Sequence, residues 1–263
     1  MNTISFISAN YVARALNYNG DENWGTHDSA TVAAASPEHF SAIAHDVKTA
    51  GFDAIDIWMA HCHFRNHDAE LRDNVKNICA DHGLQITSYA GGLNAQSQDD
   101  VEELFAFASQ LGAPIFAGGI HGSGADPALI NDVAQKHGVR WAFENHPEKS
   151  ADEILARIGN GKYEHCGVAL DTGWCGTQGL DALETVKAIR EKLFILHLKD
   201  VLTAGGHDTC APGDGVVNCE GVVRYLVETG WQGTICIEHE PYDRDPMPEA
   251  IIGVQRVQQW LQP

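Results

Sequence analysis

The sequence predicts an α/β fold, a single (β/α)8 TIM barrel that spans residues 1–263. Short apolar runs of strand length alternate with amphipathic stretches of helical period, and a glycine often separates a helix from the next run. The repeating unit is about 30 residues long, which is typical of strand–helix units with parallel strands. Eight such units follow one another without a linker, which favours a closed barrel. A doubly wound open sheet is the alternative, but no Gly-x-Gly-x-x-Gly motif follows the first apolar run.

The apolar runs place the eight strands in order along the chain. Most of them are rich in Val, Ile, Phe or Trp, and these residue types favour strands. The predicted strands are residues 4–9, 52–58, 84–89, 114–117, 139–144, 166–171, 193–197 and 233–238.

The helices between the strands are predicted from their capping residues and their apolar period. Ser36 is a predicted N-cap with Pro37 in the first turn, and this helix is expected to end at Gly51. Further start and stop signals are Gly83, Gly112, Pro127, Gly138 and the capping-box pair Ser150 and Glu153.

The charge and composition exclude several classes of partner. The chain has 17 Lys and Arg against 36 Asp and Glu, a formal net charge of −19. Nucleic acids and anionic lipids are bound through Lys and Arg, so we expect neither a nucleic acid nor a membrane as partner. No apolar run is long enough to span a membrane, and the first residues do not resemble a secretory signal, so a cytoplasmic protein is expected. The seven cysteines form no Cys-x-x-Cys pair, and we expect them to be reduced and buried.

Four consecutive predicted strands end in a residue that can bind a metal. These residues are Glu144, Asp171, His197 and Glu238. Active sites of such barrels lie at the C-terminal ends of the strands, and neighbouring strands are only about 5 Å apart. The four side chains can therefore converge on one divalent ion at strands 5–8. An oxygen-rich set with one imidazole suits Mn2+ best, with Mg2+, Co2+ or Zn2+ as alternatives.

The same strand ends resemble the single-metal site of the xylose isomerase-like superfamily, which includes sugar (phosphate) isomerases and epimerases. The resemblance rests on Phe143-Glu144-Asn145-His146-Pro147, Leu170-Asp171-Thr172-Gly173-Trp174, His197-Leu198-Lys199-Asp200, Ile237-Glu238-His239-Glu240 and the loop Pro212-Gly213-Asp214-Gly215-Val216-Val217-Asn218. It implies that a metal binds oxygens of a ketose-type sugar and stabilises an enediolate intermediate. It also implies that Glu144 and Glu238 are catalytic and exchange a proton on opposite faces of the substrate.

A second tier of residues is expected above the metal. His146 lies two residues after Glu144, and Lys199 lies two residues after His197, so both should point toward the barrel axis. His146 is a candidate catalytic acid or base, and Lys199 is a candidate cation for a substrate oxygen. Glu240 has the same phase as Glu238 and is therefore a second candidate at this position. Glu238 is preferred as the ligand because it directly ends the apolar run.

Further substrate contacts are expected at the mouth of the barrel. Asn10 ends the first predicted strand, and Trp58 and His61 lie at the end of the second. With the paired glutamate motifs they resemble a branch that includes subunits of C-glycoside-deglycosylating enzymes, which require a partner subunit. Many relatives have a histidine in the turn after the aspartate where this chain has Trp174, a candidate platform for a sugar ring.

Two chemistries remain open at this point. The first is isomerisation or epimerisation of a ketose-type sugar. The second is a lyase or dehydratase reaction on a keto-sugar, a 3-oxo-glycoside or a keto-inositol, which begins with the same proton abstraction. An endonuclease IV-like nuclease would need three metals and a cationic groove, and a non-catalytic sugar-binding barrel would not need four intact ligands. A neutral sugar is the expected substrate, and a homo-oligomer is left open.

Overall fold

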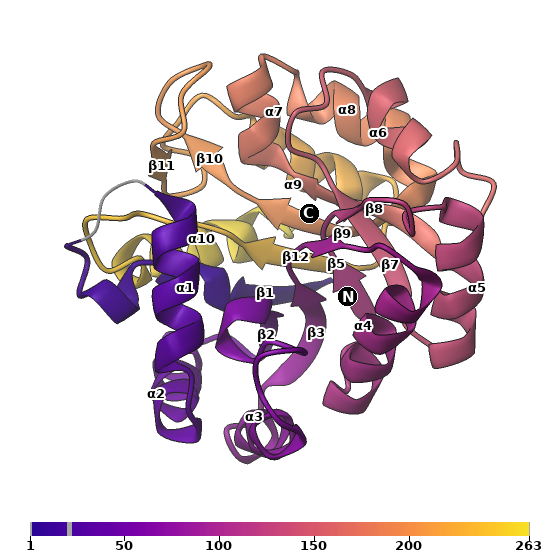
Figure 1. Ribbon diagram of the computed structural model, residues 1–263. Coiled ribbons are helices and arrows are strands. Elements are labelled where there is room, and N and C mark those ends of the chain that lie inside the picture. Colours follow the sequence, from indigo (N-terminus) through magenta and orange to yellow (C-terminus); the bar gives the residue numbers. More distant parts are fainter. Residues whose placement is uncertain (1, 20–22, 263) are drawn as a thin grey trace.

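The structure is a computed structural model that describes residues 2–19 and 23–262. Eight parallel strands close into a barrel with helices around it, which confirms the predicted fold (Figure 1). The barrel order is β1, β2, β3, β5, β7, β8, β9 and β12, and β12 pairs with β1. These strands are β1 Thr3–Ile7, β2 Ala54–Trp58, β3 Gln85–Ala90, β5 Ile115–Ala117, β7 Arg140–Glu144, β8 Cys166–Asp171, β9 Leu193–Leu198 and β12 Thr234–Ile237.

The helices lie outside the barrel, and two small sheets lie beyond the C-terminal ends of its strands. The helices in the described ranges are α1 Trp24–Ala34, α2 Pro37–Thr49, α3 Ala69–Asp81, α4 Gln98–Leu111, α5 Pro127–His137, α6 Ala151–Arg157, α7 Thr172–Gln178, α8 Ala182–Ile189, α9 Cys219–Glu228 and α10 Met247–Trp260. The small sheets pair β4 Leu93–Asn94 with β6 Ile120–His121, and β10 Asp200–Val201 with β11 Thr209–Cys210.

The predicted helix signals act as expected at most positions. The Ser36 hydroxyl accepts a hydrogen bond of 3.1 Å from the His39 N–H and caps α2. Gly112 and Gly138 follow α4 and α5 with φ of 92° and 66°, a left-handed conformation that glycine adopts without strain. Ser150 caps α6, but Glu153 accepts from the N–H of Lys149 rather than from that of Ser150. The capping box predicted there is therefore only half formed.

Two segments near the N-terminus differ from the prediction, and several later strands begin or end one or two residues away from the predicted bounds. The first strand ends at Ile7 rather than at residue 9, because the buried 3-10 turn Ser8–Tyr11 carries the chain away from the barrel. Helix α1 was not predicted, because its sequence mixes small, polar and apolar residues without a helical period. Only His27 and Thr31 of this helix are buried.

The core fills the barrel and the layer between barrel and helices. The largest fully buried side chains include Trp141, Tyr11, Tyr89 and Phe6. All seven cysteines are buried and free of disulfides, as expected. No helix in the described ranges is long and apolar enough to cross a membrane.

Candidate metal centre

The barrel brings the four predicted ligands to one end. Glu144 and Asp171 are the last residues of β7 and β8, His197 lies near the end of β9, and Glu238 directly follows β12. Asp171 and His197 are paired in register across neighbouring strands. The four side chains thus lie at the C-terminal mouth, where barrel enzymes carry their active sites.

His197 is the centre of a cluster that contains three of these ligands. Its Nδ1 lies 2.5 Å from Oε1 of Glu144 and 3.0 Å from Oε2 of Glu238. One ligand atom from each of the three residues lies within 4.8 Å of the others. Two carboxylates and one imidazole at this spacing could hold one divalent cation.

Lys199 forms the adjoining part of the site. Its Nζ lies 2.9 Å from Oε1 of Glu238, 2.5 Å from Oε2 of Glu240 and 3.6 Å from Oδ2 of Asp171. Glu238 therefore belongs both to the His197 cluster and to the Lys199 cluster. Glu240 pairs with Lys199, which agrees with the preference for Glu238 as the ligand beside His197.

Asp171 lies at the border of the three-residue cluster. Its Oδ1 accepts hydrogen bonds of 2.7 Å and 3.2 Å from the N–H groups of Gly173 and Trp174 and so caps α7. Only Oδ2 is left to face Lys199. The structure therefore joins three of the four predicted ligands directly, and Asp171 is connected to them through Lys199.

Burial and unbalanced charge perturb the acids of the site. Burial, with the charge of Glu238, raises the pKa of Asp171 to about 7. Burial also raises the pKa of Glu240 to about 8, although Lys199 opposes this shift. For His197 burial acts to lower the pKa, but the carboxylates of Glu144 and Glu238 prevail and hold it well above its ordinary value.

The donor set fits a divalent cation. The hydrogen bond of His197 Nδ1 goes to Glu144, so Oε2 of Glu238, 3.0 Å from the same nitrogen, is buried without a hydrogen-bond donor of its own. A buried carboxylate oxygen in this state is costly unless a cation satisfies it. Four carboxylates, those of Glu144, Asp171, Glu238 and Glu240, lie around Lys199 and the imidazole of His197. The residues that would hold the ion are Glu144, His197 and Glu238, with Asp171 beside them.

His146 and Trp174 line the space above this cluster. Nε2 of His146 lies 3.9 Å from Oε2 of Glu144, and its side chain is 45% exposed. The ring of His146 meets that of Trp174 edge-on at 5.2 Å, and Trp174 meets His207 at 5.0 Å. His146 is therefore free to approach a ligand in the cavity, as the second-tier prediction requires.

Two predicted substrate contacts are placed elsewhere. The prediction that Asn10 and His61 face the mouth is wrong, because both are buried and do not line the cavity. The Asn10 amide donates to the carbonyl of Ile237 and accepts from the N–H of His239, so it holds the chain after β12 in place. His61 bonds Ser8 through Nδ1 at 3.0 Å, and burial lowers its pKa to about 3.

A cavity of about 700 Å³ opens above the candidate metal centre. Its walls include the predicted site residues Trp58, Glu144, His146, Trp174, Lys199, Glu238 and Glu240. Trp24 and Trp58 pack at 5.3 Å with tilted rings on one side of it. The remaining aromatic and histidine residues of the lining are His63, His121, His207 and Tyr242.

Sequence reasoning missed Trp24, Tyr242 and the buried Asp56. Trp24 and Tyr242 come from α1 and the loop after β12, and only the closed barrel brings them to the same cavity. Asp56 carried a usable signal, because it is a charged residue inside an apolar strand and is completely buried.

The loop at residues 212–218 does not offer a phosphate site. The N–H groups of Gly213 and Gly215 donate to Oδ2 of Asp200 at 2.9 Å and 3.0 Å, and that of Val217 donates to Oδ1 at 2.9 Å. A side chain at Gly215 would collide with Asp200 and Val201, so glycine is required there. The backbone donors that could have bound a phosphate are therefore used by the buried Asp200.

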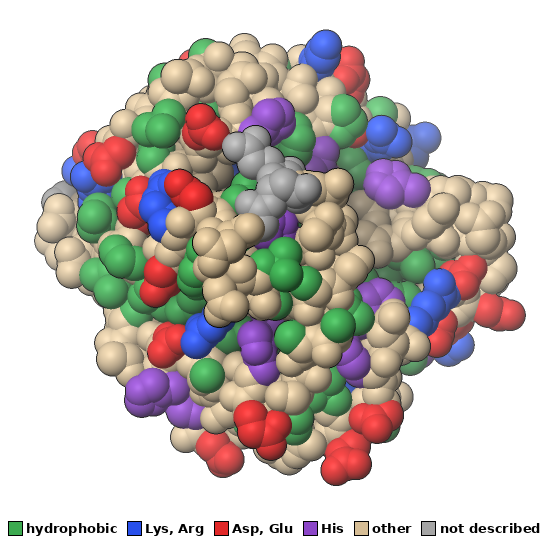
Figure 2. Space-filling model, turned by 60° about the vertical axis from the view of Figure 1, so that its left-hand side comes forward, with side chains coloured by type: hydrophobic (Ala, Val, Ile, Leu, Met, Phe, Trp, Pro, Cys, Tyr) green, Lys and Arg blue, Asp and Glu red, His purple; other side chains and the backbone are tan. Residues whose placement is uncertain are grey.

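Several basic side chains on the surface are paired with acidic ones. Arg65 pairs with Asp100 and Glu103, and Lys136 pairs with Glu102. On the face drawn in Figure 2, blue side chains lie scattered next to red ones rather than gathered into a patch. This distribution offers no groove suited to a nucleic-acid backbone on that face.

Residues 44–262 match the xylose isomerase-like TIM barrel family. The chain belongs to this family. Membership covers the strands from β2 to β12 and therefore all four predicted metal ligands.

Solved structures of sugar epimerases share the fold. The chain superposes on an L-ribulose 3-epimerase with a TM-score of 0.71 at 16% identity, covering 100% of this chain and 95% of that one. The D-psicose 3-epimerase of Clostridium cellulolyticum H10, solved with D-tagatose, gives a TM-score of 0.71 at 14% identity, covering 99% and 100%. A probable 3-DHS dehydratase, AsbF, from Bacillus anthracis gives 0.69 at 13% identity, covering 98% and 99%.

Among curated proteins, an inosose isomerase of Halalkalibacterium halodurans is 27% identical over 122 residues. The match covers 41% of this chain and 42% of that protein. The solved structures thus show a shared fold, and the chain matches less than half of the length of this curated relative.

Proposed function

We propose that the protein is a divalent-metal-dependent isomerase or epimerase of a neutral ketose-type sugar. The observation that carries the proposal is the cluster of Glu144, His197 and Glu238 at the base of a 700 Å³ cavity. Carboxylates beside a cation site can take a proton from the carbon next to a carbonyl. The epimerases that share the fold support this assignment.

A divalent cation held by Glu144, His197 and Glu238 would supply Lewis acidity and so make the C–H next to the substrate carbonyl more acidic. Glu144 removes this proton, and Glu238 returns a proton to the other face of the resulting enediolate. The two carboxylates reach His197 from different strands, β7 and β12, which suits access from two sides. Lys199 binds a substrate oxygen, and Trp58 and Trp174 pack against the apolar face of the sugar.

A neutral substrate is supported by the electrostatics of the cavity. Lys199 faces three carboxylates, so its charge is already compensated. Asp28, Glu144, Glu238 and Glu240 all line the cavity, and the backbone donors of the 212–218 loop are bound to Asp200. A phosphorylated sugar would meet repulsion here rather than attraction.

The test is proton exchange in D2O with added Mn2+ and a panel of ketoses, 3-oxo-glycosides and inososes. Deuterium should appear at the carbon next to the carbonyl together with a new isomer. The variant E238Q should stop epimerisation while metal is still bound. Absence of exchange with every substrate in the metal-loaded wild type would contradict the proposal.

A lyase or dehydratase acting on a keto-sugar, a 3-oxo-glycoside or a keto-inositol is the second candidate. It is favoured by the size of the cavity, which exceeds the needs of one monosaccharide, and by the aromatic pair Trp24 and Trp58. In this reaction His146 would protonate the leaving group. H146A should then harm turnover more than E238Q, and water or an aglycone should be released without a new stereoisomer.

We also propose that the partner is a small sugar rather than a nucleic acid or a membrane, and that the protein works in the cytoplasm. The net charge of −19 supports the first point. Mn2+ is the metal we propose, because oxygen ligands dominate the cluster.

A further inference from the structure

We propose that Asp56, on the far side of His197 from the metal centre, is a positioning residue that holds the His197 ring with Nδ1 facing the metal. Asp56 lies in β2, across the barrel from β9. This inference rests on the metal site of the proposed function. It adds Asp56 to the site, a residue from the first half of the chain that does not line the cavity and does not contact the atoms that would bind the metal.

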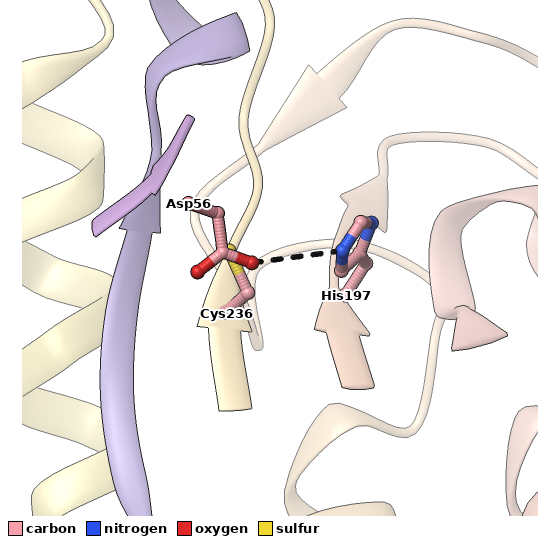
Figure 3. A group of neighbouring side chains, drawn as sticks. All are labelled: Asp56, His197 and Cys236. Atoms are coloured by element: carbon pink, nitrogen blue, oxygen red, sulfur yellow. Dashed lines mark ion pairs between the residues drawn. The ribbon is translucent and has the colours of Figure 1, made fainter. Parts of the chain in front are cut away.

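The two nitrogens of His197 face different groups. Nδ1 faces Glu144 and Glu238, whereas Nε2 is buried without a hydrogen bond and lies 3.9 Å from Oδ2 of Asp56. Figure 3 shows the Asp56 carboxylate pointing toward the His197 ring, with the sulfur of Cys236 next to the carboxylate. An imidazole that carries its proton on Nε2, toward a carboxylate, presents the Nδ1 lone pair to a metal.

The neighbouring strand fixes the Asp56 carboxylate. The hydroxyl of Thr87 donates to Oδ1, and the hydroxyl of Ser88 donates to Oδ2 at 2.9 Å. Two consecutive residues can do this because the register of β2 and β3 shifts after Ile55, which pairs with Ile86, so that Asp56 is opposite Ser88. A β-bulge of this kind redirects side chains and is frequent beside active sites.

A purely structural role leaves the position of Asp56 unexplained. Its side chain is fully buried, and burial of a carboxylate is costly without an ionic partner. Among the ion pairs of the described residues, the partner of Asp56 is His197. The carboxylate thus faces a histidine, and this histidine is the central residue of the proposed metal site.

The experiment measures metal affinity in folded protein by competition with a chromogenic chelator, using Mn2+ and Co2+. D56N keeps the size of the side chain but removes its charge, and it should weaken binding by about 10–100-fold. The visible spectrum of bound Co2+ should also change, because the orientation of a ligand ring changes. C236A is the matched control, since it removes a neighbouring side chain of the same buried group but leaves the Asp56 carboxylate in place, and it should bind metal as the wild type does.

Each outcome decides a separate point. Failure of the wild type to bind metal would contradict the proposed function itself. Wild-type affinity in folded D56N would overturn the role of Asp56 while leaving the proposed function intact. Loss of metal in C236A equal to that in D56N would also overturn it, because Asp56, His197 and Cys236 would then themselves form a metal site.

If D56N does not fold, T87V removes one of the two hydroxyl donors, and it should show a smaller loss of affinity with an altered Co2+ spectrum. An unchanged affinity and spectrum in T87V would then overturn the role of Asp56.

Discussion

Each carboxylate of the metal centre has a distinct set of neighbours, so the site can be dissected residue by residue. Glu144 contacts His197 and lies within 3.9 Å of His146. Glu238 contacts both His197 and Lys199. Asp171 uses one oxygen to cap α7. Substitutions at these positions should therefore separate proton transfer from metal binding.

Replacement of Glu144 and His146 should affect different properties. E144Q should abolish turnover even where some metal is retained, because an amide cannot act as a base. H146A should keep the metal content of the wild type and lower the rate by about 10²–10⁴-fold if His146 is an acid or base. Metal analysis of the purified variants and initial rates would check both. An unchanged rate in H146A would reduce this residue to a structural part of the rim.

Asp171 and Glu240 are the two further carboxylates that could be the fourth metal ligand. Two conservative variants test which of them binds the metal. D171N should lower metal affinity by more than about tenfold, because Oδ2 is the free oxygen that borders the cluster. E240Q should leave affinity near that of the wild type, because Glu240 pairs with Lys199. Titration with Mn2+ would measure both, and the reverse order would assign Glu240 to the metal.

At the scale of elements, the caps show where local sequence determines structure. Ser97 and Asp100 form a complete capping box at α4, in which Asp100 also binds Arg65. The hydrogen bond from the N–H of Gln96 is the main cause of the lowered pKa of Asp100, and the N–H of Ser97 adds to it. A lowered pKa means that the ionised carboxylate stabilises the folded state.

The stability contributed by Asp100 should therefore depend on pH in a defined direction. It is fully present above the unfolded pKa of Asp, about 3.9, and it is lost as the pH falls through the lower folded pKa. D100N should melt a few degrees below the wild type at pH 7, and the gap should close in acid. Thermal melts from pH 7 to about pH 2 would measure it, because the folded pKa lies below the ordinary value of an aspartate. D99N, an exposed neighbour in the same turn, is the control and should melt near the wild type at every pH.

The elements that sequence predicted well are those whose pattern is local. Cys166–Asp171 was predicted to the residue, because an apolar run and a polar end define it. The first strand was predicted in the same way to continue to residue 9, which placed Asn10 at the mouth of the barrel. This prediction is wrong because the chain turns at Ser8. Whether a strand continues or bends into a 3-10 turn depends on the partner that bonds Asn10, which is 227 residues away at Ile237.

For the whole molecule, the site joins residues from both halves of the barrel. The clustering of Glu144, His197 and Glu238 could be predicted because consecutive strand ends in the sequence become neighbours in the closed sheet. Three features could not be predicted: the places of Trp24 and Tyr242 in the cavity wall and the contact of Asp56 with His197. They depend on the closure of the barrel and on loops whose sequence has no hydrophobic period.

Metal binding should stabilise the entire barrel. A ligand that binds only the folded state at about 100 times its Kd adds about 2.7 kcal/mol. For a domain of this size, each kcal/mol raises Tm by about 2–4 °C, so saturating Mn2+ should raise it by several degrees. Calorimetry with and without EDTA would measure the shift. E144Q should show a smaller shift, and an identical shift in wild type and variant would place the ion elsewhere.

The reactivity of the seven buried cysteines can measure how often each part of the barrel opens transiently. Burial raises the pKa of Cys62, Cys79 and Cys166 to about 12, so neither access nor thiolate is available in the closed state. An aromatic disulfide reagent should therefore react at the frequency with which the surrounding segment opens. Cys236, deep in the barrel, should be among the last to react, and it should react more slowly when Mn2+ is present. Mass spectrometry of the labelled thiols would then rank the segments of the barrel by their frequency of opening, without any engineered probe.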